Sequence, residues 1–569
     1  MWVISNKRVK RFSELSQKEH CGYSYYSDNI VPPKTESSLI HLGNPYQHTR
    51  LSSGQLSHQS GLNTDYKIGN DVIDTFDGIF TLLRLDDNSF SLFSDRFGIA
   101  KFFYWINGDE FIISDNLKII VQTIKAKPSS ENMAIYALTY HFIGGRTLYE
   151  NVYYNRPAEI IEFKDGKLSF SIYWDAANLL NQEKRKVSIR EISHKIICAV
   201  DKNISKEPQK RISLSLTGGA DTRNLLSVFL KLGIRPHLYT YGNPLSADCV
   251  KARAIAKGLG LEHEIYDIRM TASIFAEYAR KIIRLGNSLA SIHRVHRLIA
   301  VEHENKYAEV MFMGTLGGEF VKGVSEDDYI VPAIIYENWQ MKNFSNILIS
   351  GYCQRKGLQT ENINIDDVKL YLSDQPFFKG DIISRKNYSL SHLTASLHDA
   401  QDINLYRSVM DEVYSPFLDV DYLETLFSSS FSFDNKERIK NHIIKRIENP
   451  IYASNFLAHV YPQLLQFEYS GHHKPSEVLV NKYYAALLKY IRAHIRPAYP
   501  PNFPLMNWME EFVREYLPKC YDFTILQKTF DLDSMIYELD HSQHQPKESY
   551  WLRFTNPIMM MYILEEFGQ

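Results

Sequence analysis

One short run of residues has the composition of a phosphate-binding loop. Residues 215–223 read Ser-Leu-Thr-Gly-Gly-Ala-Asp-Thr-Arg. The adjacent glycines Gly218 and Gly219 allow backbone N–H groups to turn inward and approach phosphate oxygens closely. Thr217 and Thr222 can donate hydroxyl hydrogen bonds to the same oxygens. The run therefore predicts a loop that binds the phosphates of a nucleotide.

The elements expected on either side of this loop favour the prediction. A short apolar strand over 212–216 ends in Leu216, which we include in the site, and an apolar helix is expected over 224–232. The N-terminus of a helix adds further N–H groups and the positive end of its dipole. Asp221 places a carboxylate beside the expected polyphosphate, which suggests that Mg²⁺ lies between the two. The alternative is a strand-to-helix turn that needs its glycines for geometry alone.

Strands and helices alternate around the loop. The apolar periodicity predicts a helix over 187–205, a strand over 237–241, a helix over 247–259 and a strand over 265–268. Alternation at this spacing is typical of a parallel α/β sheet. Further on, the pattern is mostly helical, with helices expected over 292–305, 478–493 and 506–516. We expect an α/β domain with a helical C-terminal part over residues 185–569.

Residues 1–184 have a different, β-rich pattern. Runs of aromatic and β-branched residues at 90–93, 101–105 and 110–114 are separated by turns rich in Gly, Asp and Asn. Two further runs flank Asp165-Gly166, which predicts a hairpin. Hairpins at this spacing indicate antiparallel sheets packed in layers. We therefore place a domain boundary after residue 184.

The composition limits the classes of function. The chain has 569 residues, of which 44% are hydrophobic and 23% charged, as in an ordinary globular protein. Its formal net charge of −2 argues against a dedicated nucleic-acid binder. Five scattered cysteines without a CxxC pair fit a reducing compartment and predict no zinc ribbon. Because no signal-peptide pattern and no apolar run of membrane-spanning length is present, we expect a cytoplasmic protein.

The loop resembles the Ser-Gly-Gly-x-Asp-Ser pyrophosphatase loop of enzymes that cleave ATP between its α and β phosphates. Other motifs are similar to those of asparagine synthetases, in the same order. They are Phe-Asp-Gly-Ile-Phe at 76–80, Ser-Asp-Arg-Phe-Gly-Ile at 94–99, Phe-Tyr at 103–104, Ile-Ser-Asp at 113–115, Arg-Pro-Ala at 156–158, Tyr-Trp at 173–174 and Ser-Pro-Phe-Leu-Asp at 415–419. The chain thus resembles the asparagine synthetase-like superfamily, which includes asparagine synthetases, β-lactam synthetases, lasso-peptide cyclases and synthetase-like proteins of polysaccharide clusters. The resemblance implies an Ntn-glutaminase-like α+β sandwich (class II glutamine amidotransferase type) over 1–184, followed by an ATP pyrophosphatase-loop domain over 185–569.

The N-terminal part departs from the glutamine-dependent members of that superfamily. Those begin Met-Cys-Gly, whereas residue 2 here is Trp. Cys21-Gly22 is similar to the missing pair, but its use would require removal of everything before it, so we interpret Cys21 as an ordinary cysteine. The Arg-Gly-Pro-Asp and Asn-Gly-Glu motifs that hold glutamine in relatives are also missing. We expect a degenerate glutaminase domain in which Asp95-Arg96 forms a structural ion pair or turn.

A second departure falls on an acidic loop. Relatives have Ser-Gly-Glu-Gly-x-Asp-Glu after a strand, and the corresponding run at 313–320 is Met-Gly-Thr-Leu-Gly-Gly-Glu-Phe. By resemblance, Thr315 replaces the first Glu, Gly318 replaces an Asp that helps to hold Mg²⁺, and Glu319 is retained. We predict that Glu319 is a catalytic base or a metal ligand together with Asp221. A solvated carboxylate at the start of a helix is the alternative.

The resemblance implies further nucleotide contacts. In relatives, the segment that corresponds to Tyr241, Gly242 and Asp248 lines the nucleotide site, and residues 238–241 would lie beside the adenine. Gly314 belongs to the same predicted site. An N-cap for the helix that begins near residue 249 is an equally good interpretation of Asp248.

Basic and histidine residues give weaker signals. In relatives, a lysine near the C-terminal end stabilises the charge that develops on pyrophosphate. Lys474 is best placed for this catalytic role, and Lys440 is the second candidate; an ordinary surface lysine is the alternative for both. His293 and His296 could share one helix face. No Glu lies between them as in a zinc motif, so we favour ordinary helix surface or substrate contacts.

Together these features predict an ATP-dependent, AMP-forming amide ligase. It would adenylate a carboxylate of a small molecule, peptide or glycan and couple it to ammonia or a substrate amine, with ATP and Mg²⁺ as cofactors. A separate glutaminase or a pathway partner could take part, and no nucleic-acid partner is expected. One alternative is an asparagine synthetase that uses ammonia, against which Thr315 argues. The other is a non-catalytic nucleotide-binding scaffold, while tRNA thiolation is disfavoured.

Overall fold

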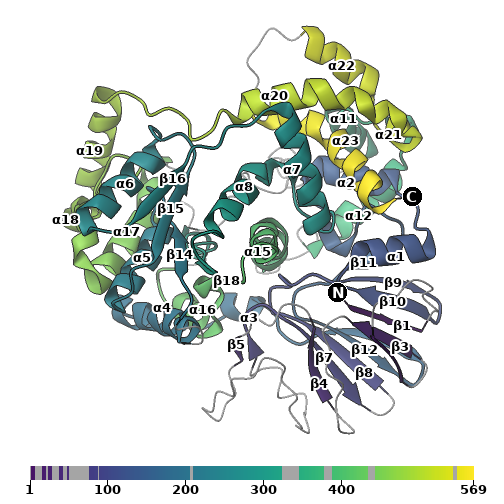
Figure 1. The fold of residues 1–569 in the computed structure, drawn as a ribbon, viewed down its shortest axis with the longest axis horizontal. Coiled ribbons are helices and arrows are strands. Elements are labelled where there is room, and N and C mark those ends of the chain that lie inside the picture. The colour runs from purple at the N-terminus through teal and green to yellow at the C-terminus, as the bar shows by residue number, and fades with distance from the viewer. Residues whose placement is uncertain are drawn as a thin grey trace.

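The structure is a computed structural model that describes residues 2–6, 16–20, 23–27, 38–42, 48–49, 76–86, 89–205, 209–322, 345–376, 387–432, 442–541 and 548–568. Cys21 and Lys440 lie outside these residues. Figure 1 shows antiparallel strands from the first part of the chain at the lower right, a helix-covered parallel sheet at the left, and C-terminal helices at the upper right.

Two antiparallel sheets form the N-terminal part. Their strands are β1 Trp2–Ser5, β2 Ser16–His20, β3 Tyr23–Ser27, β4 Ser38–Leu42, β7 Thr81–Asp86, β8 Ser89–Ser94, β9 Phe103–Asn107, β10 Glu110–Ser114, β11 Val152–Tyr154, β12 Glu159–Lys164 and β13 Lys167–Ile172, with β5 His48–Thr49 and β6 Phe76–Asp77 as a separate pair. The sheet orders are β11-β9-β10-β1-β3-β2 and β13-β12-β8-β7-β4. Ile4 and Phe111 from the first sheet share a buried core with Phe90 and Phe163 from the second. The sheets therefore pack face to face, as the hairpin spacing predicted.

The predicted hairpin illustrates how local sequence sets the register. Asp165 and Gly166 have φ angles of 51° and 78°, as a two-residue turn between twisted strands requires. The turn pairs Lys164 with Lys167, and the ladder continues to Glu159 and Ile172.

Helices connect the N-terminal sheets to the end of the chain. They are α1 Leu117–Ile124 and α2 Ser130–Thr139, which contact α23 Glu548–Phe567, and a short α3 Ala177–Leu180 follows the sheets. The Tyr136 hydroxyl donates to the Met559 sulfur at 2.9 Å. The first and last parts of the chain thus share one core.

The second half contains a five-stranded parallel sheet. Its strands are β14 Ile212–Ser215, β15 His237–Tyr241, β16 His263–Tyr266, β17 Val310–Phe312 and β18 Glu412–Tyr414, and the helices between and before them are α4 Ile189–Ile204, α5 Asp221–Lys231, α6 Ala247–Leu259, α7 Ala272–Leu285 and α8 Val295–Glu304. The sheet order is β16-β15-β14-β17-β18, with every pair parallel. The predicted α/β alternation is present.

The rest of the chain is mainly helical. The helices are α9 Glu319–Lys322, α11 Asn346–Arg355, α12 Ile365–Asp374, the π-helix η5 Tyr388–Asp399, α15 Ala400–Arg407, α16 Val420–Phe427, α17 His442–Val460, α18 Pro475–Val480, α19 Lys482–Ile495, α20 Leu505–Tyr516, α21 Thr524–Thr529 and α22 Leu532–His541. Over the part of the chain that the structure describes, none of the helices combines the length and the apolar character needed to cross a membrane.

Several predicted boundaries differ from those of the structure. The helix expected over 224–232 already begins at Asp221, and the strand expected over 265–268 lies over 263–266. The single helix expected over 478–493 is two helices, α18 and α19. Asn481 separates them because its backbone is extended and its side chain accepts the N–H groups of the first turn of α19. It is therefore an N-cap.

We predict that Asn481→Ala loosens α19 locally. The variant removes the acceptor of two N–H groups and should destabilise the helix by about 1 kcal/mol. Because Ala485 is the only buried residue of α19, amide exchange should accelerate there by roughly fivefold without a change in global unfolding. Hydrogen exchange with mass spectrometry measures this, and Asn481→Ser, which keeps a capping oxygen, is the control. Equal exchange in Asn481→Ala and the unsubstituted protein would contradict the assignment.

Candidate functional site

The carboxyl ends of β14 and β17 meet where the strand order of the parallel sheet reverses. Counted from β14, the order is 3-2-1-4-5, so the first and fourth strands are neighbours. Ligands of open α/β sheets bind in the crevice at such a point. The loop after β14, residues 216–220, and the loop after β17, residues 313–318, both begin there. The topology thus joins two segments that the sequence assigned to nucleotide binding.

Hydroxyl groups of the 216–220 loop and of Thr222 form hydrogen bonds that define the conformation of this loop. Thr217 Oγ1 accepts the N–H of Gly219 at 3.2 Å, and Thr222 Oγ1 accepts the N–H of Thr217 at 3.4 Å. The two hydroxyl oxygens are 3.5 Å apart. Leu216 is fully buried and hydrogen-bonds through its backbone to β15. These four predicted residues therefore form one compact turn at the end of β14.

Asp248 ties this loop to two distant segments. Its Oδ1 accepts the Gly218 N–H at 3.1 Å and the Ser470 hydroxyl at 2.8 Å, while its Oδ2 accepts the Asn502 amide at 2.8 Å. A Cβ on Gly218 would lie 1.9 Å from Ser470 Oγ, so a larger residue would displace the Ser470 hydroxyl from Asp248. The interpretation of Asp248 as a helix cap was wrong, because Ser246 caps α6.

A buried cation, Arg223, lies under the loop. Its guanidinium donates to the carbonyls of Phe467 and Glu468 at 2.8 and 2.9 Å, and lies 4.3 Å from the ring centre of Tyr469. Another N–H of the same group points at the Gly218 carbonyl, 3.5 Å away. Burial lowers the pKa of Arg223 to about 10, so the group stays protonated at neutral pH. The loop that is expected to bind phosphate therefore rests on a positive charge.

Two glycines let the loop after β17 approach α5 closely. A Cβ on Gly314 would lie 3.0 Å from Thr222 N, and one on Gly318 would lie 2.8 Å from Asp221 Oδ2. Any larger residue would displace the start of α5. The structure thus brings Asp221, Thr222 and Gly314 together, with the Asp221 carboxylate against Gly318.

Glu319 begins α9 directly after this contact, and its charge acts on Asp399. Burial, then the charges of Glu319 and Asp402, raise the pKa of Asp399 well above its ordinary value. Asp402 is instead paired with Arg294 and Arg297. Burial would raise the pKa of Asp402, but the two guanidinium groups outweigh it and lower that pKa to about 2. Asp399 is thus a carboxyl group that retains a proton readily.

The acids at the crevice fit a magnesium ion that shares its coordination with phosphates. Mg²⁺ is usually held by one or two carboxylates, with phosphate oxygens and water completing the set. Asp221 offers a carboxylate at the start of α5, and Glu319 follows the glycine that touches it. In the described ranges no three His, Cys, Asp or Glu side chains are grouped to hold a metal on their own. The donors therefore suit an ion that arrives with a nucleotide.

Tyr241 and Gly242 lie at the end of β15 and pack against residues 502–503, which are distant in the chain. The Tyr241 ring centre is 5.8 Å from that of Phe503 and 6.0 Å from that of His296. Gly242 has φ 126°, and a Cβ there would lie 2.8 Å from the Asn502 carbonyl oxygen. Burial lowers the pKa of His296 to about 3, so this ring is a neutral packing partner.

Lys474 lies on a segment that reaches the loop. It follows Ser470, whose N–H donates to the Gly218 carbonyl at 3.0 Å. Lys474 occupies the N-cap position of α18, and its own N–H donates to Glu477 at 2.9 Å. Contact between its ammonium group and pyrophosphate stays a prediction.

The family motifs of the N-terminal part have structural roles. The Asp95 carboxylate closes the turn after β8 by accepting the N–H groups of Phe97, Ile99 and Ala100 at 3.1, 3.0 and 2.8 Å. Arg96 pairs with Asp77 at 3.4 Å. Trp2 is buried, with its ring centre 6.0 Å from that of Phe102. The predicted structural turn is confirmed, and the ion-pair partner of Arg96 is Asp77.

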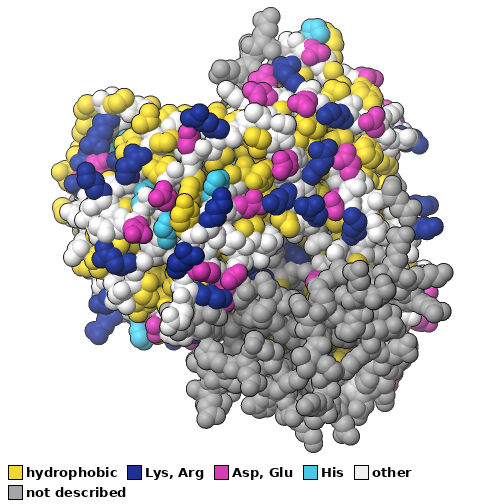
Figure 2. Space-filling view, in the orientation of Figure 1, with side chains coloured by type: hydrophobic (Ala, Val, Ile, Leu, Met, Phe, Trp, Pro, Cys, Tyr) yellow, Lys and Arg dark blue, Asp and Glu magenta, His cyan; other side chains and the backbone are white. Residues whose placement is uncertain are grey.

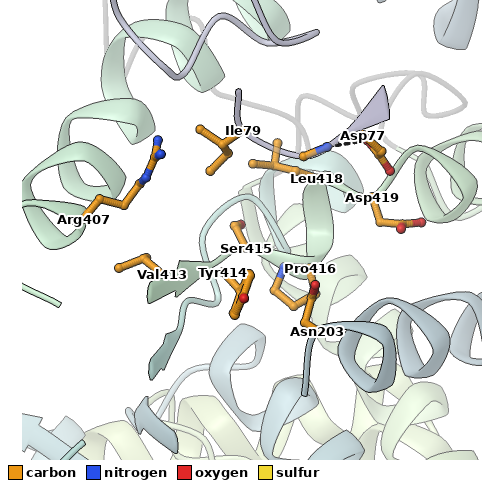
Figure 3. Close-up of a pocket in the computed structure, with 11 residues that line it drawn as sticks. Asp77, Ile79, Asn203, Arg407, Val413, Tyr414, Ser415, Pro416, Leu418 and Asp419 are labelled. Carbon is orange, nitrogen blue, oxygen red and sulfur yellow. Dashed lines mark hydrogen bonds between the residues drawn. The ribbon is translucent and has the colours of Figure 1, made fainter. Parts of the chain in front are cut away.

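A small cavity lies between the N-terminal part and the end of β18 (Figure 3). It is lined by residues 77–79, Asn203, Arg407, 413–416 and 418–419. Its volume of 20 Å³ admits about one water molecule, so it is a packed junction and not a substrate pocket.

Two carboxyl groups face this junction. Asp77 accepts the Val420 N–H at 3.2 Å, and Asp419 caps α16 and lies 3.8 Å from Lys202. Burial, then the negative charge of Asp77, raise the pKa of Asp419 to about 6. The junction therefore contains a titratable group close to neutral pH.

Four residues of this candidate site were not predicted from the sequence: Arg223, Asp399, Ser470 and Asn502. Arg223 could have been found, because it places a charge on the buried side of an apolar helix. Ser470 and Asn502 lie 222 and 254 residues from Asp248 in the chain, so local patterns could not pair them with it.

We predict that Gly218→Ala destabilises the fold by about 1–3 kcal/mol, because its methyl group would overlap Ser470 Oγ. Ser470→Gly removes the obstructing atoms and should rescue part of that loss. Urea unfolding of both single variants and the double variant gives the coupling. If the changes in unfolding free energy of the two single variants simply add up to that of the double variant, the close approach of residues 218 and 470 is contradicted.

We predict a pH-dependent stability difference for Asp419→Asn. Because the native pKa of Asp419 is raised above its unfolded value, its protonated form stabilises the fold, and this contribution is lost as pH rises through about 6. The variant should therefore gain about 1–3 kcal/mol relative to the unsubstituted protein between pH 4 and pH 7. Denaturant unfolding at several pH values measures this, with the exposed Asp109→Asn as control. Parallel curves for the unsubstituted protein and Asp419→Asn would refute the assignment.

Comparison with known proteins adds a family context. A family model described as a glutamine amidotransferase domain matches residues 62–174. This range contains most of the motifs that the sequence analysis compared with the N-terminal domain of asparagine synthetases.

Curated relatives and a solved structure give further similarities. The chain is 24% identical over 251 residues to a Methanocaldococcus jannaschii protein described as "putative asparagine synthetase 2 (glutamine-hydrolyzing)", which covers 40% of this chain and 48% of the relative. It is 24% identical over 180 residues to glutamine-hydrolyzing asparagine synthetase 3 of Bacillus subtilis, which covers 30% and 29%. The chain therefore spans about half or less of these relatives. An NMN synthetase structure from Francisella tularensis aligns with 13% identity and a TM-score of 0.21, over 36% of this chain and 93% of that chain. Taken with the motifs, the amidotransferase match and the two relatives support the resemblance of this chain to the asparagine synthetase-like superfamily.

Proposed function

We propose that the protein is an ATP-dependent, AMP-forming amide ligase. The observation that carries the proposal is the meeting of the loops that follow β14 and β17. There the Thr-Gly-Gly-x-Asp-Thr loop lies at the strand-order reversal, with Gly314 and Gly318 packed against the start of α5. The resemblance to the asparagine synthetase-like superfamily supports a ligase or amidotransferase in general, and the two loops at the strand-order reversal support nucleotide chemistry in particular.

The proposed roles follow from the positions of the residues. The turn formed by Leu216, Thr217, Gly218 and Gly219, together with Thr222, would bind the phosphates over the positive charge of Arg223. Residues 241–242 and Gly314 would line the nucleoside side, and Asp248 would position the loop. Asp221 and Glu319 would hold Mg²⁺. When bound, the ion would neutralise charge on the phosphates.

The proposed reaction proceeds in two steps. A substrate carboxylate oxygen attacks the α-phosphate, the bond to the β-phosphate oxygen breaks, and pyrophosphate leaves. Lys474 would stabilise the negative charge that develops on this leaving group. An amine then attacks the acyl carbon, AMP departs, and a carboxylate accepts the proton of the amine. Glu319 is the candidate for this base if it does not bind the metal, with Asp399 beside it.

The nitrogen source that we propose is ammonia or an amine of the substrate. Asp95 and Arg96, which lie in a motif of the N-terminal part, have structural contacts. We therefore propose a degenerate glutaminase domain over 1–184 and a synthetase domain over 185–569. A carboxylate on a small molecule, peptide or glycan is the proposed acceptor, and a separate glutaminase could supply ammonia.

We predict ATP–pyrophosphate exchange that depends on Asp221. Purified protein with Mg²⁺ and a panel of carboxylates should exchange labelled pyrophosphate into ATP when the substrate carboxylate is present. Asp221→Ala should reduce this exchange by roughly 100-fold or more, since it removes a proposed metal ligand. Asp201→Ala, on the exposed side of α4, is the matched control and should leave exchange unchanged.

The outcomes separate the alternatives. Exchange with aspartate and ammonia would favour an asparagine synthetase, and exchange with another carboxylate would identify a different ligase. Binding of Mg·ATP by calorimetry without exchange across a broad panel would favour a nucleotide-binding scaffold. The absence of both pyrophosphate exchange and Mg·ATP binding would refute the proposed function.

A further inference from the structure

A second, larger cavity lies between the N-terminal sheets and the π-helix η5. Its volume of 360 Å³ falls within the range of small-molecule pockets, about 300–1,000 Å³. It is lined by the 3₁₀ helix η2 Ile143–Gly145, the segments that flank the hairpin β12–β13, the end of α12, and η5. A Cβ on Gly144 would lie 2.6 Å from Gln375 Oε1, so glycine there allows the end of α12 to close one side. The loops after β14 and β17, which the structure describes, do not line this cavity.

A cavity is a better place for a charged ligand than the open surface. On the face of the molecule in Figure 2, Lys and Arg side chains are interspersed with Asp and Glu side chains over the described part. Charges of both signs that are mixed on a surface largely cancel one another, whereas charges that line a cleft act on its contents through a low dielectric. The charged residues of the cavity therefore decide which ligand fits.

The β12–β13 hairpin places two opposite charges at the same end. Its ladder pairs Glu159 with Ile172, and the next backbone hydrogen bond, 3.0 Å long, continues the same register. Three positions beyond that pair, the register sets Arg156 opposite Asp175. Both residues line the cavity. Among the described contacts, no ion pair joins them, because each is held by a different partner.

Glu159 orients the guanidinium group of Arg156. The Nε of Arg156 donates to Glu159 Oε1 at 2.7 Å, and the backbone N–H of Arg156 donates to Oε2 at 3.1 Å. Glu159 is fully buried, whereas the Arg156 side chain keeps 43% of its surface exposed. The described residues supply no partner for the two terminal nitrogens of Arg156. This edge of the planar group can therefore donate two hydrogen bonds to a ligand carboxylate.

Asp175 is anchored through one of its two oxygens. Its Oδ1 accepts the Asn387 amide at 2.6 Å and the Ala177 N–H at 2.8 Å. Within the described ranges, its Oδ2 receives no hydrogen bond, so that oxygen can accept from a ligand ammonium group. The preceding residue, Trp174, also lines the cavity and packs edge-on against Phe97, with ring centres 5.4 Å apart. An aromatic wall thus adjoins the charged groups.

The π-helix η5 adds a polar wall to the cavity. The residues of η5 and its N-cap that form this wall are Asn387, Ser391, His392 and Ser396. Their spacing of four and five residues groups them on one face of a helix whose hydrogen bonds span five residues. Burial, then the charges of Lys101 and Arg156, lower the pKa of His392 to about 3, so its neutral ring can both donate and accept. Such π-helical stretches are rare and frequently lie at functional sites.

The charges that line the cavity are balanced. The charged lining residues are Arg96, Arg156, Asp175 and Asp374. A ligand with only a negative charge would meet the two acids, and a ligand with only a positive charge would meet the two arginines. A molecule with one charge of each sign finds an opposite charge at Arg156 and at Asp175.

We propose that this cavity binds a zwitterion with a carboxylate and an ammonium group, either a free amino acid or a short peptide. The ligand carboxylate would accept hydrogen bonds from Arg156, and the ammonium group would donate to Asp175. Trp174 and the polar face of η5 would contact the rest of the molecule. The proposal does not rest on the proposed ligase function, because the loops assigned to that function do not line the cavity.

The test is calorimetric binding to the full chain without ATP. The probes are the twenty standard amino acids and the dipeptides Gly-Gly and Ala-Ala. We expect saturable binding of at least one of them. The N-acetyl and carboxamide derivatives of that probe, which each lack one charge, should bind roughly tenfold more weakly or worse. A dipeptide that binds more tightly than any amino acid would identify a peptide ligand, and the reverse order would identify an amino acid.

Matched variants locate the bound probe. Asp175→Asn keeps an oxygen for its two present donors but loses the charge, and should weaken binding by roughly tenfold or more. Arg156→Lys keeps a charge beside Glu159 but loses the planar fork, and should also weaken binding. Asp165→Asn, at the other end of the same hairpin, is the control. Its φ of 51° suits asparagine, so binding should be unchanged. Thermal unfolding without ligand checks that each variant is folded.

Three results would overturn the proposal. The first is no binding of any probe to the unsubstituted protein. The second is binding that Asp175→Asn and Arg156→Lys both retain in full, which would place the probe elsewhere on the molecule. The third is equal binding of the probe and its two uncharged derivatives. ATP–pyrophosphate exchange is measured separately, so a failure of the ligase function leaves these outcomes readable.

Discussion

One carboxylate, that of Asp248, holds three separate parts of the chain at the candidate site. It accepts hydrogen bonds from the Gly218 N–H, the Ser470 hydroxyl and the Asn502 amide. Each of these donors would lose its partner if the carboxylate were absent, and a buried donor without a partner is destabilising by about 1–3 kcal/mol. The glycine matters equally, because a side chain at residue 218 would occupy the space of Ser470. Asp248 therefore fixes the relative positions of three segments: the loop after β14, the segment before α18 and the segment before α20.

Several charged side chains are buried near the loops that follow β14 and β17. Arg223 lies under the loop with its N–H groups directed to backbone carbonyls, while Arg294 and Arg297 neutralise Asp402. Removing one partner of such a buried pair is strongly destabilising, so these charges are fixed by the fold. Asp399 differs from them, because burial and then the charge of Glu319 raise the pKa of its carboxyl group. A fixed positive charge under the loop and two acidic groups beside it would suit chemistry in which pyrophosphate leaves and an amine loses a proton.

The predictable part of this protein is the part determined by local sequence. The expected strand over 237–241 and helix over 247–259 coincide with β15 and α6, and Asp165-Gly166 forms its hairpin turn. Asn481 was missed because a capping side chain between two apolar runs leaves the helical periodicity almost intact. The contacts of Asp248 were missed for a different reason, since they join segments that only tertiary packing brings together. The motifs predicted two loops that the fold brings together at the ends of β14 and β17, whereas the contacts of Ser470 and Asn502 with Asp248 could come only from the structure.

One polar network joins the segment around α19 to the loop after β14. Glu468 accepts hydrogen bonds from Lys251 and Arg496, and its backbone carbonyl accepts from Arg223. Burial would raise the pKa of Glu468, but the two cations outweigh it and lower that pKa to about 2. Because basic side chains of α19 and the residue that follows it are drawn inward by this acid and by Glu477, the apolar side chains of the helix have only the solvent side left. The exposure of the apolar side chains of α19 is therefore a geometric consequence of how the segment before α18 is held against the loop after β14.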